Sequence, residues 1–160
     1  MAAKPEPLAV GIEAPDFTAT TFDGTTVHLA DHRGSVVALY FYPADDTPGC
    51  TKQACNLRDN TTELTDRGVV VIGVSPDAND SHQRFAEKYQ LPFPLVADPD
   101  HEIIDAYGVW GEKKNYGRTY EGLARTTFLI GPDGVIVHVF KRPKVADHTA
   151  EILRKLPAAS

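Results

Sequence analysis

The sequence is short of basic residues, of cysteines and of long apolar segments. Sixteen lysines and arginines stand against 22 aspartates and glutamates, which leaves a net charge of −6. No basic run is longer than two residues, so we expect no binding of nucleic acid through its phosphates. The longest apolar run, residues 36–42, is far shorter than the roughly 20 residues that span a bilayer. We therefore expect no membrane partner.

What is present fits one folded domain. Hydrophobic residues make up 42% of the chain and charged residues 24%, which excludes wholesale disorder. A length of 160 residues predicts a single domain over residues 1–160. No apolar stripe demands a second copy, so we expect a monomer. Residues 1–7 lack the apolar core of a signal peptide, and we expect a cytoplasmic protein.

Apolar, β-branched runs alternate with helix-compatible segments along the chain. Residues 36–42 and 69–75 have the continuous apolar character of strands covered on both faces. Turn residues such as Asp23-Gly24 mark the hairpins. The pattern predicts a hairpin over 16–29, strands at 36–42, 69–75 and 93–97, helices at 50–67, 81–90, 101–107 and 147–156, a loop over 109–124, and a hairpin over 126–140.

This order of elements predicts an α/β fold. Strands that alternate with helices form parallel units with right-handed crossovers, and the closing hairpin adds an antiparallel edge. The result is a thioredoxin-like sandwich, in which a central mixed β-sheet is flanked by helices and an extra N-terminal β-hairpin is added. Fold alone does not give a function, which depends on reactive side chains such as the cysteines.

Two cysteines lie five residues apart, at Cys50 and Cys55. A zinc site needs two further cysteine or histidine ligands, and the nearest following histidine is His82, so we expect no metal. A thioredoxin-type dithiol enzyme would have a C-x-x-C motif, which is two residues narrower. The remaining alternatives for these thiols are a reactive pair or buried, inert side chains.

The position of Cys50 favours a nucleophile. It follows the carboxyl end of a predicted central strand and lies in the first turn of a predicted helix. The positive end of the helix and its unpaired backbone N–H groups stabilise a thiolate over a thiol. Gly49 allows the backbone to approach a ligand closely, and Thr47 places a hydroxyl three residues before the sulfur. The alternative is that Cys50 is a small hydrophobic residue at a helix start.

The segment around Cys50 carries a family resemblance. Pro43-x-x-x-Thr47-x-x-Cys50 resembles the active-site signature of peroxiredoxins, and residues 45–55 (DDTPGCTKQAC) resemble the bacterioferritin comigratory protein (Q-type) subfamily. The likeness covers nearly the whole chain and includes residues 14–17, 74–77 and 125–130. Two positions depart from the pattern, Ala44 and Gln53, and neither is expected to take part in the chemistry.

The resemblance implies a role for each motif residue. Cys50 would be the peroxidatic cysteine, which attacks a hydroperoxide and becomes a sulfenic acid, and Cys55 would be the resolving cysteine. An intramolecular disulfide would follow, with thioredoxin or glutaredoxin as its reductant and no cofactor. Thr47 would orient the peroxide with its hydroxyl, and Pro43 would shield the sulfur from water. The backbone N–H of Gly49 would hold the substrate oxygens, and Arg125 would be the active-site arginine of the family.

Each implied role has a simpler alternative. Thr47 could be a helix cap or a turn hydroxyl, and Cys55 a helical residue without redox chemistry. Arg125 could be a surface residue paired with a carboxylate; without the resemblance nothing distinguishes it from the other arginines, Arg58, Arg118 and Arg142. Trp110 and Tyr116, in the predicted loop, could line a substrate rim, although ordinary packing is favoured.

Three classes of function remain open at this point. The first is a thiol peroxidase that reduces hydrogen peroxide and organic hydroperoxides. The second is a binding protein or holdase that uses the disulfide as a redox switch, and the third is a general thiol-disulfide oxidoreductase. Catalytic consumption of peroxide separates the first class from the second, and reduction of insulin without peroxide identifies the third.

Helix geometry adds one more expectation. Residues five apart on a helix have Cα atoms about 8.6 Å apart, beyond the roughly 4.4–6.8 Å that a disulfide tolerates. If both cysteines are helical in the reduced protein, residues 50–57 must unwind before they can bond. The polar residues Thr51, Gln53 and Asn56 predict little resistance to this unwinding.

Overall fold

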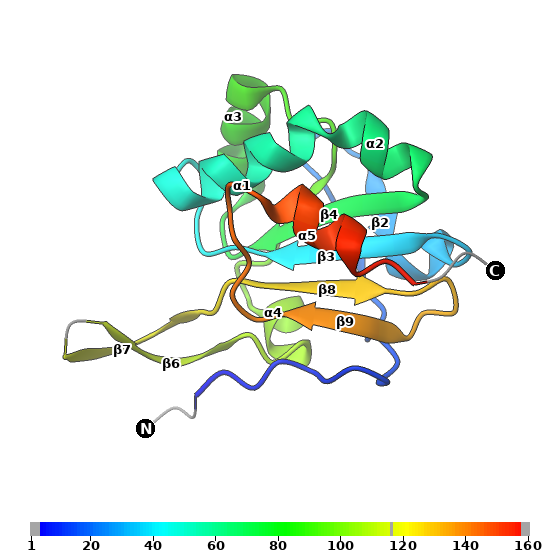
Figure 1. Cartoon of the computed structure of the whole chain (residues 1–160). Helices are drawn as coiled ribbons and strands as arrows, with labels where there is room; N and C mark the ends of the chain where they lie inside the picture. Colours follow the sequence, from blue (N-terminus) through cyan, green and yellow to red (C-terminus); the bar gives the residue numbers. More distant parts are fainter. Residues whose placement is uncertain (1–3, 116, 158–160) are drawn as a thin grey trace.

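A central five-stranded sheet organises the chain (Figure 1). The computed structural model describes residues 4–115 and 117–157. In spatial order the strands are β5 (Leu95–Ala97), β4 (Val69–Ser75), β3 (Val36–Phe41), β8 (Thr126–Ile130) and β9 (Ile136–Phe140). The first three are parallel, whereas β8 runs antiparallel to β3, and β9 antiparallel to β8. The expected mixed sheet is confirmed.

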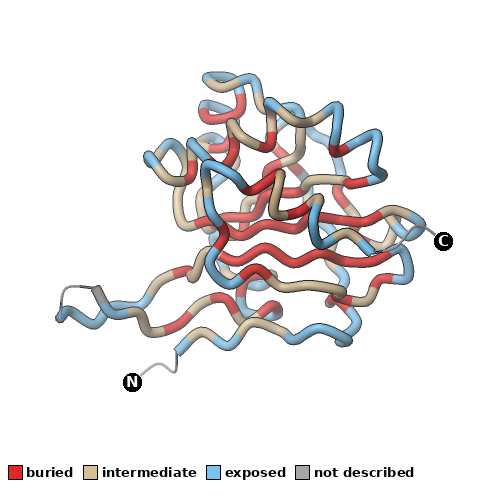
Figure 2. Tube along the Cα trace, in the orientation of Figure 1, coloured by how far each residue is buried: buried red, intermediate tan, exposed pale blue. Residues whose placement is uncertain are grey.

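Side chains of β3 alternate between two apolar layers, one on each face of the sheet. Val36, Ala38 and Tyr40 pack under four helices, which all lie on the same side in Figure 1. They are α1 (Pro48–Asp59), α2 (Thr61–Asp66), α3 (Asn79–Tyr89) and α5 (His148–Arg154). Both faces of β3 are therefore covered, which explains its uninterrupted apolar sequence and its continuous burial in Figure 2.

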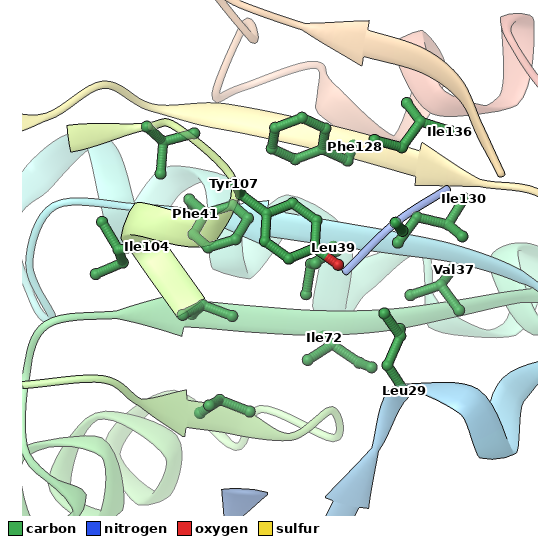
Figure 3. Close-up of a cluster of buried hydrophobic side chains, with 14 of the residues drawn as sticks. Leu29, Val37, Leu39, Phe41, Ile72, Ile104, Tyr107, Phe128, Ile130 and Ile136 are labelled. Carbon is green, nitrogen blue, oxygen red and sulfur yellow. The ribbon is translucent and has the colours of Figure 1, made fainter. Parts of the chain in front are cut away.

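The opposite face carries the second layer. Leu39 and Phe41 of β3 pack there against the ring of Tyr107 and the side chain of Ile104 (Figure 3). Helix α4 (Glu102–Ala106), the N-terminal segment and the hairpin of β1 (Thr18–Thr20) and β2 (Thr26–His28) cover this face. A short 3-10 turn, Leu29–His32, follows β2. The predicted N-terminal hairpin is confirmed.

The helix expected over 50–67 is two helices. It begins earlier, at Pro48, where a proline loses no helical hydrogen bond, and it breaks at Asn60. There Asn60 Nδ2 donates to the Asn56 carbonyl at 2.7 Å, and the Thr61 hydroxyl donates to the Arg58 carbonyl at 2.8 Å. Side chains that bond to the preceding carbonyls compete with the helical ladder, so α1 ends at Asp59 and α2 starts at Thr61.

The loop expected over 109–124 is wrong. Strands β6 (Trp110–Asn115) and β7 (Arg118–Leu123) form an antiparallel hairpin that extends from the body of the molecule (Figure 1). Its charged residues and glycines hide the alternating pattern of a half-buried strand. Trp110 packs against the ring of His101, with centroids 4.2 Å apart, and Tyr116 lies outside the described residues.

Candidate active site

Cys50 lies at the start of α1, directly beyond the carboxyl end of β3. Thr47 is the N-cap residue in an extended conformation, so Cys50 is the third residue of the helix. The Cys50 side chain is 1% exposed and Cys55, also on α1, is half-buried. Both thiols are free. The expected position of Cys50 in the first helical turn is therefore confirmed.

Arg125 contacts this sulfur. Its Nη2 donates to Cys50 Sγ at 3.2 Å, and its Nη1 donates to Gln53 Oε1 at 2.6 Å. Strand pairing accounts for the approach, because Phe41 at the end of β3 lies opposite Thr126 at the start of β8. The residue that precedes β8 therefore reaches the helix that follows β3. A delocalised guanidinium with two donors pointing at one site is suited to stabilise negative charge on sulfur and on a bound oxygen.

Gln53 is a residue that sequence reasoning placed outside the chemistry. It is fully buried, and it fixes one nitrogen of Arg125. The Nε2 of Gln53 and the phenol oxygen of Tyr40 are two of the three buried side-chain atoms without a hydrogen-bond partner among the described residues; the third, Asn79 Oδ1, lies away from this site on α3. Burial raises the pKa of Tyr40 well above its usual value, and the nearby Cys50 raises it further. The spacing of Cys50 and Gln53, one helical turn apart, is the signal that could have identified Gln53.

The backbone at Gly49, directly before Cys50, lies close to the Arg125 guanidinium. A Cβ on Gly49 would lie 3.2 Å from Arg125 Nη2, so any side chain there would press on the guanidinium. The Thr51 N–H donates to the Thr47 carbonyl, whereas no acceptor is recorded within the described residues for the N–H groups of Gly49 and Cys50. These are the unpaired donors of a helix start.

Thr47 acts as a turn hydroxyl. Its Oγ1 donates to the Ala44 carbonyl at 3.0 Å, and the side chain does not cap the helix. Because the hydroxyl proton is used in the turn, the lone pairs of the oxygen remain able to accept a hydrogen bond. Pro43, the residue directly after Tyr42, is half-buried in the same turn.

A buried polar network holds this turn against α3. His82 and the Asp45 carboxylate are almost fully buried, and His82 Nδ1 lies 2.7 Å from Asp45 Oδ2. His82 Nε2 lies 3.1 Å from the Val96 carbonyl, so both ring nitrogens face acceptors. The Tyr42 hydroxyl and the Ser81 hydroxyl also donate to Asp45. Sequence reasoning did not identify this network, because its members are separated along the chain.

On the surface, Asp46 also connects the turn before Cys50 to α3. It has a left-handed backbone, with φ of 55°, and its carboxylate accepts from Lys88 Nζ and the Tyr89 hydroxyl, each at 2.8 Å. The Lys88 hydrogen bond is the main reason why the pKa of Asp46 is lowered. Asp45 and Asp46 together tie the turn before Cys50 to α3.

A groove opens beside Arg125. It has a volume of about 660 Å³ and is bounded by the N-terminal segment, the β6–β7 hairpin and the segment after β9. Its walls combine apolar residues (Pro5, Pro7, Ala124 and Pro143) with positively charged ones (Lys4, Lys113, Lys114, Lys141 and Arg142) and one acidic residue, Glu112. An extended organic molecule could therefore approach Arg125 along an apolar wall.

The expectation that residues 50–57 resist unwinding only weakly is wrong. Gln53, Ala54 and Leu57 are each no more than 1% exposed, and Asn56 forms hydrogen bonds to Ala146 and Thr149 before and within α5. The polar residues of this segment look compatible with a loose helix only while their tertiary partners are unknown. Unwinding therefore has to break buried packing and contacts between helices.

Two kinds of structural feature are absent from the described part of the chain. No group of three or more His, Cys, Asp or Glu side chains there is arranged to hold a metal ion. Across residues 4–115 and 117–157, no helix has the length and apolar character required to cross a membrane.

Comparison with known proteins identifies the family of this chain. The model of the AhpC/TSA family matches residues 10–139. The peroxiredoxin Bcp of Escherichia coli is 48% identical over 94% of this chain and 96% of its own, and that of Bacillus subtilis is 44% identical over 93% and 95%. The solved structure of the Xanthomonas campestris bacterioferritin comigratory protein, also named peroxiredoxin Q, superposes with a TM-score of 0.80 at 36% identity, over 86% of this chain and 88% of that one. The chain therefore belongs to the AhpC/TSA family, as a peroxiredoxin of the bacterioferritin comigratory protein (Q-type) subfamily.

Proposed function

We propose that this protein is a thiol-dependent peroxidase in which Cys50 reduces hydrogen peroxide and organic hydroperoxides. The observation that carries the proposal is the contact of Arg125 Nη2 with Cys50 Sγ at 3.2 Å, at the positive end of a helix. Both the guanidinium and the helix start stabilise a thiolate. Membership of the peroxiredoxin subfamily supports the same reaction class.

The first step forms a sulfenic acid. The Cys50 thiolate attacks the terminal peroxide oxygen, the O–O bond breaks, and the leaving oxygen takes a proton to give water or an alcohol. Negative charge spreads over sulfur and both oxygens, where Arg125 and the N–H groups of Gly49 and Cys50 can stabilise it. Thr47 can accept a hydrogen bond from the peroxide O–H, and Pro43 limits the access of water to the sulfur.

The groove beside Arg125 supports the inclusion of organic hydroperoxides. Its apolar wall can hold the carbon chain of such a substrate while the peroxide group lies at Arg125. Hydrogen peroxide needs no such wall, so Pro143→Asp, which places a charge on the apolar wall, should lower activity toward organic hydroperoxides and leave that toward hydrogen peroxide unchanged.

Cys55 completes the cycle in this proposal. Its thiol attacks the Cys50 sulfenic acid, an intramolecular disulfide forms, and water leaves. The disulfide is then reduced by thioredoxin or glutaredoxin, as in an atypical 2-Cys peroxiredoxin. We expect a monomer that contains all of these residues in one domain.

Coupled turnover tests the proposal. Oxidation of NADPH is followed with thioredoxin, its reductase and either hydrogen peroxide or an organic hydroperoxide. Wild type should turn over many times, whereas a redox switch would consume about one equivalent of peroxide and stop. Reduction of insulin without peroxide would instead indicate a general disulfide reductase.

Two serine variants test the roles of the thiols. Cys50→Ser should abolish activity, because a hydroxyl is not ionised at neutral pH. Cys55→Ser should keep the first attack on peroxide, lose turnover with thioredoxin and accumulate sulfinic acid. Turnover by Cys50→Ser would exclude Cys50 as the nucleophile, and normal cycling by Cys55→Ser would exclude Cys55 as the resolving thiol.

A further inference from the structure

Asn56 joins α1 to the start of α5, one residue beyond Cys55. Its Nδ2 donates to the Ala146 carbonyl at 3.1 Å, and its Oδ1 accepts the Thr149 backbone N–H at 2.8 Å. The Asn56 carbonyl accepts the Thr149 hydroxyl at 3.3 Å. We call these three contacts the Asn56 clamp.

The Asn56 clamp provides a hydrogen-bond acceptor for a backbone N–H at the start of α5. The first N–H groups of a helix have no partner within it, and Thr149 is the second residue of α5. Asp147, at the N-cap position, does not accept a hydrogen bond with its side chain. The carboxamide of Asn56, on a different helix, therefore takes the part of an N-cap side chain. Because both helices depend on these contacts, a change in α1 at Asn56 also affects α5.

Disulfide formation acts on the same stretch of backbone, and the inference rests on the proposed function. Cys50 and Cys55 are both within α1, about 140° apart around the helix axis. Bringing Cys55 toward Cys50 rotates the peptide that Cys55 shares with Asn56. This rotation moves the Asn56 carboxamide away from Ala146 and Thr149, so the clamp has to open as α1 unwinds.

We propose that Asn56 is a positioning residue that sets the rate of disulfide formation by holding α1 wound. While the clamp is closed, Cys50 stays beside Arg125, where it reacts with peroxide. The sulfenic acid then has two fates: the Cys55 thiol displaces water from it, or a second peroxide oxidises it to sulfinic acid. The clamp opposes only the first of these, so it also determines how readily Cys50 is over-oxidised.

Asn56→Ala removes both side-chain contacts and should accelerate disulfide formation about tenfold, equivalent to ~1.4 kcal/mol. Asn56→Asp keeps an acceptor for the Thr149 N–H, where a negative charge is favourable, and should change the rate less than about threefold. Asn79→Ala is the matched control, because Asn79 Nδ2 donates to the Thr20 carbonyl far along the chain from either cysteine. It should leave the rate unchanged.

The measurement is a single turnover with one equivalent of hydrogen peroxide, quenched at intervals, alkylated and analysed by mass spectrometry. The same samples give the ratio of disulfide to sulfinic acid at higher peroxide, which Asn56→Ala should raise about tenfold. A substitution that destabilises the protein away from α1 and α5, such as Asn79→Ala, would not move this ratio. In oxidised wild type, the Thr149 amide should lose its protection from hydrogen exchange.

The outcomes separate the two proposals. If wild type forms no Cys50–Cys55 disulfide, the proposed resolving role of Cys55 fails, and the role of Asn56 fails with it. If the disulfide forms but Asn56→Ala matches wild type or is slower, only the role of Asn56 is overturned. Full protection of the Thr149 amide in the oxidised protein would overturn it independently of any substitution.

Discussion

Replacing Arg125 with lysine separates the charge of this side chain from its geometry. The two terminal nitrogens of Arg125 donate to different acceptors, to Cys50 Sγ at 3.2 Å and to Gln53 Oε1 at 2.6 Å. Lysine carries a single nitrogen, which cannot take both positions. The Arg125→Lys variant therefore loses at least one hydrogen bond from a charged donor.

The size of the effect follows from the hydrogen bond that is lost. A hydrogen bond to a charged group contributes about 1.5–3 kcal/mol, and ~1.4 kcal/mol changes a rate tenfold. If the lost bond stabilises the transition state, the second-order rate constant with peroxide falls by about 10- to 150-fold. Arg125 is only half-buried, so solvent screening favours the lower end of this range.

Stopped-flow measurement of the reaction with hydrogen peroxide is the assay. Arg33→Lys is the control, because Arg33 also donates from two nitrogens, to the Asp133 carbonyl and to Glu13. Arg125→Gln, which removes the charge, should in addition slow alkylation of Cys50 by a neutral reagent. A folded Arg125→Lys protein that reacts with peroxide as fast as wild type would refute the reasoning.

Three other substitutions address separate contacts. Gly49→Ala places a Cβ 3.2 Å from Arg125 Nη2 and should slow the peroxide reaction severalfold without loss of stability; an unchanged rate would mean that the guanidinium can move freely. Asp45→Asn weakens the hydrogen bonds that this buried carboxylate accepts from Tyr42 and Ser81 and its contact with His82, and should lower the free energy of unfolding in urea by about 1.5–3 kcal/mol, whereas Asp46→Asn on the surface should lower it much less. Burial lowers the pKa of His148, so the unfolded chain takes up a proton first as the pH falls below about 6.5. Stability should therefore decrease from that pH downward, and His148→Gln should reduce the decrease; an identical pH profile would contradict this assignment.

The sequence by itself determined the elements that depend on local pattern. Continuous apolar runs predicted β3 and β4, because strands covered on both faces have no polar side. The proline and glycine before Cys50 predicted a turn followed by a helix start, and this placed the thiol at the positive end of a helix. The family motif then indicated which further residues to examine. The β6–β7 hairpin was not predicted, because exposed charged strands carry no periodic apolar signal.

Only the tertiary structure decided which side chains meet. The pairing of Phe41 with Thr126 brings Arg125 to Cys50, and no local pattern distinguishes Arg125 from the other arginines. Gln53 and Asn56 looked like ordinary polar helix residues until Arg125 and the start of α5 were placed beside them. The physical reason is that hydrogen bonds between distant segments depend on sheet register and helix packing, which the whole core determines. The neighbours of a residue along the chain determine only its local conformation.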